Sequence, residues 1–183
     1  MAPAIWTIGH STHSIDELVA LLRAHDVRQV IDVRTIPRSR HNPQFNRDRL
    51  SGSLTHEGLA YRHLPQLGGL RKPIKESINT GWRNISFRGY ADYMQTGEFE
   101  KGLDMLMDCA GGAHTAIMCA EAVPWRCHRS LIADALVVRG WTVRHILSGT
   151  KAEDHHLTSF ARVEGDKIVY PPTADQRSSL PLF

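Results

Sequence analysis

The chain has 183 residues, of which 42% are hydrophobic and 22% charged, and its formal net charge is +3. These are ordinary values for a globular protein, and so mild a basic excess does not by itself indicate a nucleic-acid partner. Three cysteines, an odd number, argue against a disulfide scaffold and for a reducing cytoplasm. No apolar run reaches the ~18 residues of a membrane span, and the N-terminus lacks the layout of a signal peptide. We expect a cytoplasmic protein with no membrane partner. The chain should form one domain over residues 1–170, followed by a loosely held tail over 171–183. Composition specifies no oligomeric state.

The first 33 residues are expected to form a βαβ unit. Residues 4–8 are a short β-prone run, and Ser14 with Glu17 three positions later makes a capping box that starts a helix. Residues 29–33 are apolar in the centre, as in a parallel strand that is covered on both faces.

Strands and helices continue to alternate along the chain. The expected elements are a helix at 45–54, a strand at 60–64, a long loop at 65–87, a helix at 91–109, a strand at 116–118, a helix from Pro124, a strand at 141–147, a helix at 150–162 and a hairpin at 163–170. This order predicts an α/β fold, a single three-layer domain with a mostly parallel sheet built from βαβ units. A loop as long as 65–87 often covers a functional site.

The most reactive side chains follow the strand that ends near residue 118. Cys119 and Glu121 fall at its C-terminal end, and Cys127 is expected in the first turns of the next helix. Open α/β sheets bind ligands outside the carboxyl ends of their strands, and a helix N-terminus favours anions and thiolates. His10 follows the first strand and is expected at the same edge. We therefore take Cys119, Glu121, His10 and Cys127 as candidate catalytic groups, with a thiol as nucleophile and a carboxylate or imidazole as acid or base.

A second group of side chains at this edge is suited to hold an anion. Arginine binds phosphate or carboxylate in two-pronged contacts, and hydroxyl groups add further hydrogen bonds. The candidates are Ser11, Arg34, Arg38, Arg40, Arg71, His128 and Arg129. An anionic small molecule or a nucleic acid is the expected partner. The competing interpretation is solvated surface charge, with Glu121 paired to Arg129 and Asp32 paired to Arg34.

The same stretch also offers metal ligands. Thiolate, carboxylate and imidazole bind Zn²⁺ or Fe²⁺, which makes Cys119, Glu121, Cys127 and His128 candidate ligands. Their spacing fits no zinc-ribbon or zinc-finger pattern, and adjacent Cys127 and His128 on a helix would point about 100° apart. The structural alternative makes Cys119 a small hydrophobic residue at the end of a strand.

Seven short motifs together resemble one known family. They are residues 7–12 (Thr-Ile-Gly-His-Ser-Thr), 32–34 (Asp-Val-Arg), 37–40 (Pro-Arg-Ser-Arg), 67–71 (Leu-Gly-Gly-Leu-Arg), 87–90 (Phe-Arg-Gly-Tyr), 118–121 (Met-Cys-Ala-Glu) and 127–129 (Cys-His-Arg). From Ile5 to about His156 the chain is similar to the bacterial domain-of-unknown-function family 488, and the last two motifs are its most diagnostic part. The resemblance supports the fold and the site map more than any reaction.

We expect an enzyme of transferase or hydrolase type that acts on a phosphorylated, nucleotide-type or nucleic-acid substrate at this Arg-, Cys- and His-lined site. The first alternative is a metal-dependent enzyme, with zinc or iron held by cysteine, glutamate and histidine. The second is a non-enzymatic nucleic-acid-binding or regulatory module, whose arginines contact backbone phosphates and whose thiols are structural.

Overall fold

A six-stranded sheet organises the computed structural model, which describes residues 2–174 and 176. The strand order is β3-β2-β4-β1-β5-β6, and all neighbours are parallel except β5 and β6. The strands are β1 (Ala4–Gly9), β2 (Gln29–Asp32), β3 (Ala60–His63), β4 (Thr115–Cys119), β5 (Thr142–Ile146) and β6 (Ala152–Asp154). The helices are α1 (Ile15–Ala24), α2 (Arg47–His56), α3 (Ile85–Tyr93), α4 (Gly97–Ala110) and α5 (Arg129–Val138).

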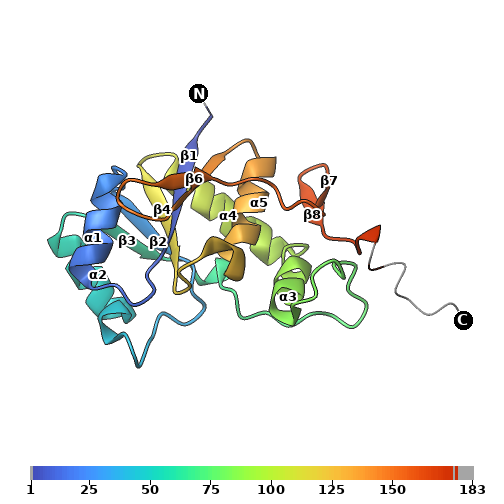
Figure 1. Cartoon of the computed structure of the whole chain (residues 1–183), viewed down its shortest axis with the longest axis horizontal. Helices are drawn as coiled ribbons and strands as arrows, with labels where there is room; N and C mark the ends of the chain where they lie inside the picture. Colours follow the sequence, from blue (N-terminus) through green and yellow to red (C-terminus); the bar gives the residue numbers. More distant parts are fainter. Residues whose placement is uncertain (1, 175, 177–183) are drawn as a thin grey trace, which may run out of the picture.

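Helices cover both faces of the sheet. In Figure 1, α1 and α2 lie on one side of the strands and α3, α4 and α5 on the other. Alternate residues of β4 enter different cores: Ala116 and Met118 pack with α1 and α2, whereas Ile117 and Cys119 pack with α3, α4 and α5. The predicted three-layer α/β fold with a mostly parallel sheet is therefore confirmed.

The first βαβ unit forms as predicted. The Ser14 hydroxyl accepts a hydrogen bond from the Glu17 amide at 3.1 Å, and the Glu17 carboxylate accepts one from the Ser14 amide at 2.6 Å. This capping box starts α1, whose Leu18 and Leu22 are buried against the sheet. The first helix thus directs the chain from the end of β1 back to the start of β2.

Two predicted helices are wrong. The helix at 91–109 is two helices, because Tyr93 ends α3 and Thr96 caps α4 by accepting a hydrogen bond from the Phe99 amide at 3.3 Å. The helix predicted at 150–162 does not form. Its first residues make β6, which pairs with β5 as the next strand of an antiparallel hairpin, and this strand pairing outweighs local helix propensity.

The start of α5 also differs from the prediction. Pro124–Arg126 forms a single 3₁₀ turn, and α5 begins only at Arg129. Cys127 between them has an extended backbone, with φ −130° and ψ 142°. The proline favours a turn here but does not propagate a helix, so Cys127 and His128 precede the helix and do not lie along it.

The C-terminal part adds the small predicted hairpin, made of β7 (Arg162–Glu164) and β8 (Lys167–Val169). Gly165 at its turn has φ +68°, a conformation that glycine adopts without strain. Most of the predicted tail over 171–183 lies outside the described residues, which exclude 175 and 177–183. No helix within the described ranges is long and apolar enough to cross a membrane.

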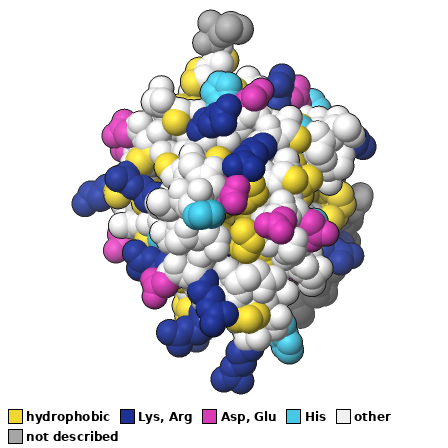
Figure 2. All heavy atoms as spheres, turned by 90° about the vertical axis from the view of Figure 1, so that its left-hand side faces the viewer, with side chains coloured by type: hydrophobic (Ala, Val, Ile, Leu, Met, Phe, Trp, Pro, Cys, Tyr) yellow, Lys and Arg dark blue, Asp and Glu magenta, His cyan; other side chains and the backbone are white. Residues whose placement is uncertain are grey.

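Charge is mixed over the surface that α1 and α2 form. Figure 2 shows basic and acidic side chains interspersed on this face. Several basic side chains gather at its lower edge, the end of the molecule where Figure 1 places the loop between β2 and α2.

Candidate functional site

The carboxyl ends of β1, β2 and β4 open into one cleft of about 690 Å³. Its walls come from the loops that follow these three strands, from Gly69 and Leu70, and from the first turn of α3. This is the edge at which open α/β sheets bind their ligands. The loop over 65–87 contributes to the wall, although much of it is tied down by Asp92, whose carboxylate accepts hydrogen bonds from Ser77 and Asn79.

Most of the candidate residues meet at this cleft. Those that line it are His10, Ser11, Arg34, Arg38, Cys119, Glu121, Cys127 and His128. Three arginines do not. Arg40 is exposed outside the cleft, Arg71 lies with its guanidinium 3.6 Å from the centre of the Tyr93 ring, and Arg129 is buried.

Two residues of the cleft, Arg126 and Asn42, are not among the site residues expected from the sequence, whereas a third, Phe87, belongs to the motif at 87–90. Exposed Arg126 lines the cleft beside Cys127, and the Phe87 ring and the Asn42 amide form other parts of the wall. Arg126 could have been predicted as a cleft residue, because it directly precedes the candidate Cys127 in the sequence. Nothing in the local sequence distinguishes Asn42 from an ordinary turn residue.

Cys119, Cys127 and His128 form the tightest cluster in the cleft. The Nδ1 atom of His128 lies 3.9 Å from Sγ of Cys119 and 3.7 Å from Sγ of Cys127. One donor atom from each residue lies within 4.8 Å of the other two. Cys119 arrives from the last residue of β4, and the extended backbone at Cys127 brings the second sulfur back towards it.

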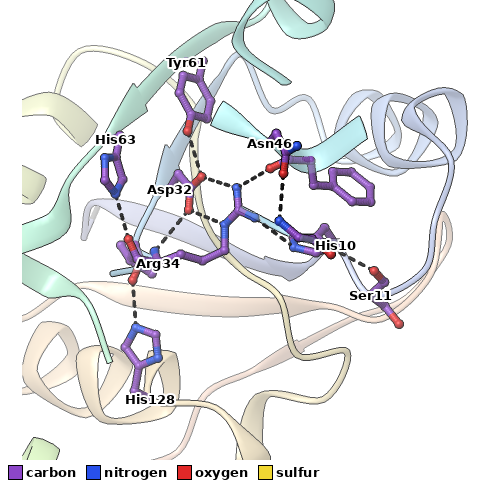
Figure 3. Close-up of polar contacts among 11 residues, drawn as sticks. His10, Ser11, Asp32, Arg34, Asn46, Tyr61, His63 and His128 are labelled. Carbon is purple, nitrogen blue, oxygen red and sulfur yellow. Dashed lines mark hydrogen bonds and ion pairs between the residues drawn. The ribbon is translucent and has the colours of Figure 1, made fainter. Parts of the chain in front are cut away.

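The orientation of the His128 ring is fixed by a backbone carbonyl. Its Nε2 lies 3.0 Å from the carbonyl oxygen of Val33, just beyond β2 (Figure 3). A carbonyl only accepts hydrogen bonds, so Nε2 carries a proton. The other ring nitrogen, Nδ1, faces the two sulfur atoms.

Gly69 explains part of the motif at 67–71. A Cβ atom at this position would lie 2.4 Å from Nδ1 of His128, closer than any real contact. Only glycine allows the backbone to pass so near the imidazole ring. Gly69 therefore covers the ring and helps to hold it in place.

The two thiols have opposite electrostatic properties. A hydrogen bond from Cys127, together with His128, lowers the pKa of Cys119 well below its ordinary value, although burial opposes this. The hydrogen bond to Cys119 and burial raise the pKa of Cys127 well above its ordinary value. Negative charge therefore resides on Cys119 first.

Arg129 is buried beside the cluster and stabilises the loop that follows β4. Only 1% of Arg129 is exposed, and burial lowers the pKa of its guanidinium. It donates hydrogen bonds to the carbonyl oxygens of Glu121 at 2.7 Å and Ala122 at 2.9 Å, which fixes the loop after β4. Within the described residues its Nε has no hydrogen-bond partner and no carboxylate pairs with it. The expected ion pair with Glu121 is thus replaced by contacts to the backbone, and the Glu121 side chain is exposed in the cleft.

A second buried network lies beside the cluster (Figure 3). Arg34 donates hydrogen bonds to both carboxylate oxygens of Asp32, at 2.9 Å and 2.6 Å, and Tyr61 donates a third at 2.8 Å. Burial opposes the charge of Arg34, but its hydrogen bonds to Asp32 outweigh this and raise its pKa. The pairing of Asp32 with Arg34, which the competing interpretation expected, is thus present.

His10 is part of the same network. Its Nδ1 lies 2.9 Å from the carbonyl oxygen of Ser11, and its Nε2 lies 3.3 Å from a guanidinium nitrogen of Arg34. Nδ1 therefore donates and Nε2 accepts. Burial lowers the pKa of His10, whose ring stacks on Phe45 at 4.1 Å between ring centres. In this arrangement both nitrogens are occupied, so His10 orders the wall of the cleft.

Comparisons with known proteins identify the family. Comparison with curated proteins gives no match, and comparison with solved structures gives none either. Residues 14–136, which include α1, the cysteine cluster and most of α5, match the family described as "Domain of unknown function DUF488". The match spans more than half of the chain and agrees with the motifs noted in the sequence. The chain belongs to the DUF488 family.

Proposed function

We propose that this protein is an enzyme of transferase or hydrolase type that acts on a phosphate-bearing, nucleotide-type substrate in the 690 Å³ cleft. The observation that carries the proposal is the cluster of Cys119, Cys127 and His128, whose donor atoms lie within 4.8 Å of one another where they line this cleft. Transfer and hydrolysis both need a group that attacks the substrate or activates an attacking water. This cluster supplies such a group.

The rest of the cleft supports an anionic substrate with an apolar part. Arg38 and Arg126 are exposed and line it, so their guanidinium groups are free to contact phosphate. Ile36, Leu70 and Phe87 line it as well and suit a flat base. A volume of about 690 Å³ falls in the ordinary range for small-molecule sites.

Binding assays test the substrate class. By calorimetry we expect the protein to bind ATP or AMP but not adenosine, because the arginines contact phosphate. The double variant Arg38→Gln/Arg126→Gln should bind these nucleotides about 10-fold more weakly or worse, since each charge-assisted hydrogen bond is worth about 1.5–3 kcal/mol. Arg162→Gln, an exposed arginine on β7, is the matched control. Equal binding by the double variant would refute the assigned role of the two arginines.

Turnover assays test the role of the cluster. Cys119→Ser should retain nucleotide binding and lose turnover of the nucleotide that the wild type converts. Retained turnover in both Cys119→Ser and Cys127→Ser would place the reactive group elsewhere.

The non-enzymatic alternative has its own supporting observation. Exposed arginines continue from the cleft mouth along the β2–α2 loop into α2: Arg38, Arg40, Arg47 and Arg49. If this surface binds nucleic acid, affinity for a single-stranded oligonucleotide should fall steeply with salt and be unchanged in Cys119→Ser. A flat salt response up to ~0.3 M would reject this alternative.

A further inference from the structure

We infer that Cys119, Cys127 and His128 bind one zinc-class divalent cation, with the fourth coordination position open to the cleft. The catalytic use of this metal rests on the function proposed above, whereas the binding of the metal rests on the geometry alone.

The distances between the donor atoms match a tetrahedral ion. Zinc binds sulfur at about 2.3 Å and nitrogen at about 2.0–2.1 Å, which places two such ligands about 3.5 Å apart. The two sulfur-to-nitrogen distances are 3.9 Å and 3.7 Å. Each sulfur-to-nitrogen distance therefore needs to shorten by only a few tenths of an ångström, and the two sulfur atoms lie within 4.8 Å of each other.

The histidine ring is already oriented as a metal ligand. Metal-binding histidines usually donate their second N–H to a carbonyl or carboxylate, which fixes the tautomer and the ring orientation. Val33 provides this carbonyl for Nε2 of His128, and Gly69 packs against the ring. Within the described residues, the hydrogen-bond contacts of Nδ1 are the two sulfur atoms alone, so this nitrogen has no oxygen or nitrogen partner.

The ligand set indicates both the metal class and the type of site. Two thiolates and one imidazole suit zinc, whereas magnesium and calcium prefer oxygen ligands. Structural zinc sites are closed by four protein ligands, while catalytic sites have three and keep one position for water or substrate. Glu121 is outside the group of converging donors but lines the same cleft, so the open position faces a space that also holds a carboxylate.

Cobalt titration of the metal-free protein tests the inference. We expect one equivalent of Co²⁺ to produce a thiolate-to-cobalt charge-transfer band and the visible bands of tetrahedral cobalt, and one equivalent of Zn²⁺ to remove them. Cys119→Ser, Cys127→Ser and His128→Gln should each lower the affinity by ~100-fold or more. Cys109→Ser is the matched control, because Cys109 on α4 is outside the cluster. No band in folded wild-type protein, or an unchanged band in the Cys119→Ser/Cys127→Ser double variant, would overturn the site.

Alkylation of the wild-type protein gives a readout that needs no variant. Zinc should protect Cys119 and Cys127 from iodoacetamide and leave the labelling of Cys109 unchanged, as measured by peptide mass spectrometry. Equal labelling of Cys119 and Cys127 with and without zinc would contradict the inference.

The outcomes separate the two proposals. Metal binding without nucleotide binding would retain the metal site and reject the substrate. Full turnover of a nucleotide by metal-free protein would reject the catalytic metal and retain the proposed function.

Discussion

Two buried histidine clusters in this protein differ in how their ring nitrogens are used. The first runs from β1 to α5: the Thr7 hydroxyl lies 2.8 Å from Nδ1 of His145, Nε2 of His145 lies 2.9 Å from Nδ1 of His155, and Nε2 of His155 lies 2.8 Å from Asp134. Every ring nitrogen has an oxygen or nitrogen partner. The second is the cysteine cluster, in which Nδ1 of His128 faces two sulfur atoms.

The difference separates a structural network from a site. Because the Asp134 carboxylate only accepts hydrogen bonds, Nε2 of His155 carries a proton, and each further ring nitrogen back to Thr7 has its own partner. Such a closed chain joins β1, β5 and α5 and leaves no group for a ligand. In the cysteine cluster the two sulfur atoms and Nδ1 of His128 converge on one another, and all three residues line a cleft. The number of histidines is therefore a weaker indicator of function than the number of donor atoms left without strong partners.

The largest effect on stability is expected from the closed network. Asp134 is fully buried and accepts hydrogen bonds from His155, the Thr158 amide and the Tyr170 hydroxyl. Asp134→Ala leaves these donors unpaired and should lower the free energy of unfolding by about 3–5 kcal/mol, measured by urea denaturation. Asp154→Ala, at an exposed ion pair with Arg144, should cost less than about 1 kcal/mol. Similar losses of unfolding free energy in both variants would contradict the structural role assigned to the buried Asp134 network.

The closed network should also make stability depend on pH. Burial, with the nearby charges of His155 and Arg129, lowers the pKa of His145 from 6.5 to about 4. Below pH 6.5 the unfolded chain takes up a proton that the folded protein does not accept until about pH 4, so stability falls across this window by up to about 3 kcal/mol. Denaturation curves at pH 7, 5.5 and 4.5 measure it. His145→Asn should reduce this loss of unfolding free energy between pH 7 and pH 4.5. An equal loss in the variant would mean that other groups cause the pH dependence.

An intermediate effect is expected where Gly69 packs on His128. In Gly69→Ala the new methyl group must displace a ring that the Val33 carbonyl holds, which should cost about 1–3 kcal/mol and weaken Co²⁺ binding. At Gly112 an added methyl group would meet nothing within 4 Å, so Gly112→Ala should leave both properties unchanged. Full metal affinity in Gly69→Ala would show that the packing does not position His128.

The smallest effect on stability is expected from the cluster itself. Cys119→Ser removes one sulfur atom from a group that no strong hydrogen bond holds, so we expect the free energy of unfolding of the metal-free protein to change by less than about 1 kcal/mol. Loss of several kcal/mol in urea denaturation would instead make Cys119 a packing residue.

Local rules predicted much of the fold and part of the site. The capping box at Ser14, the turn at Gly165 and the strand end at Cys119 are short-range features, and each occurs as expected. The helix predicted at 150–162 fails because β6 forms through pairing with β5, a contact that local propensity does not contain.

The site depended on backbone detail that the sequence does not specify. A continuous helix from Pro124 would separate the side chains of Cys127 and His128, whereas the extended backbone at Cys127 brings both to Cys119. Arg129 was expected to hold an anion, but its 1% exposure and its bonds to two carbonyls could not be inferred from its neighbours. The partner of Nε2 of His128, the carbonyl of Val33, lies 95 positions away.

The tautomer of His128 in the metal-free protein is the most direct test of the distinction between the two clusters. Long-range ¹H–¹⁵N correlation NMR, assigned with His128→Gln, reports which ring nitrogen carries the proton. We predict a protonated Nε2, bonded to Val33, and an unprotonated Nδ1 that is free to bind a metal. A proton on Nδ1 with an unprotonated Nε2 would contradict this account, because the lone pair would then point away from both sulfur atoms.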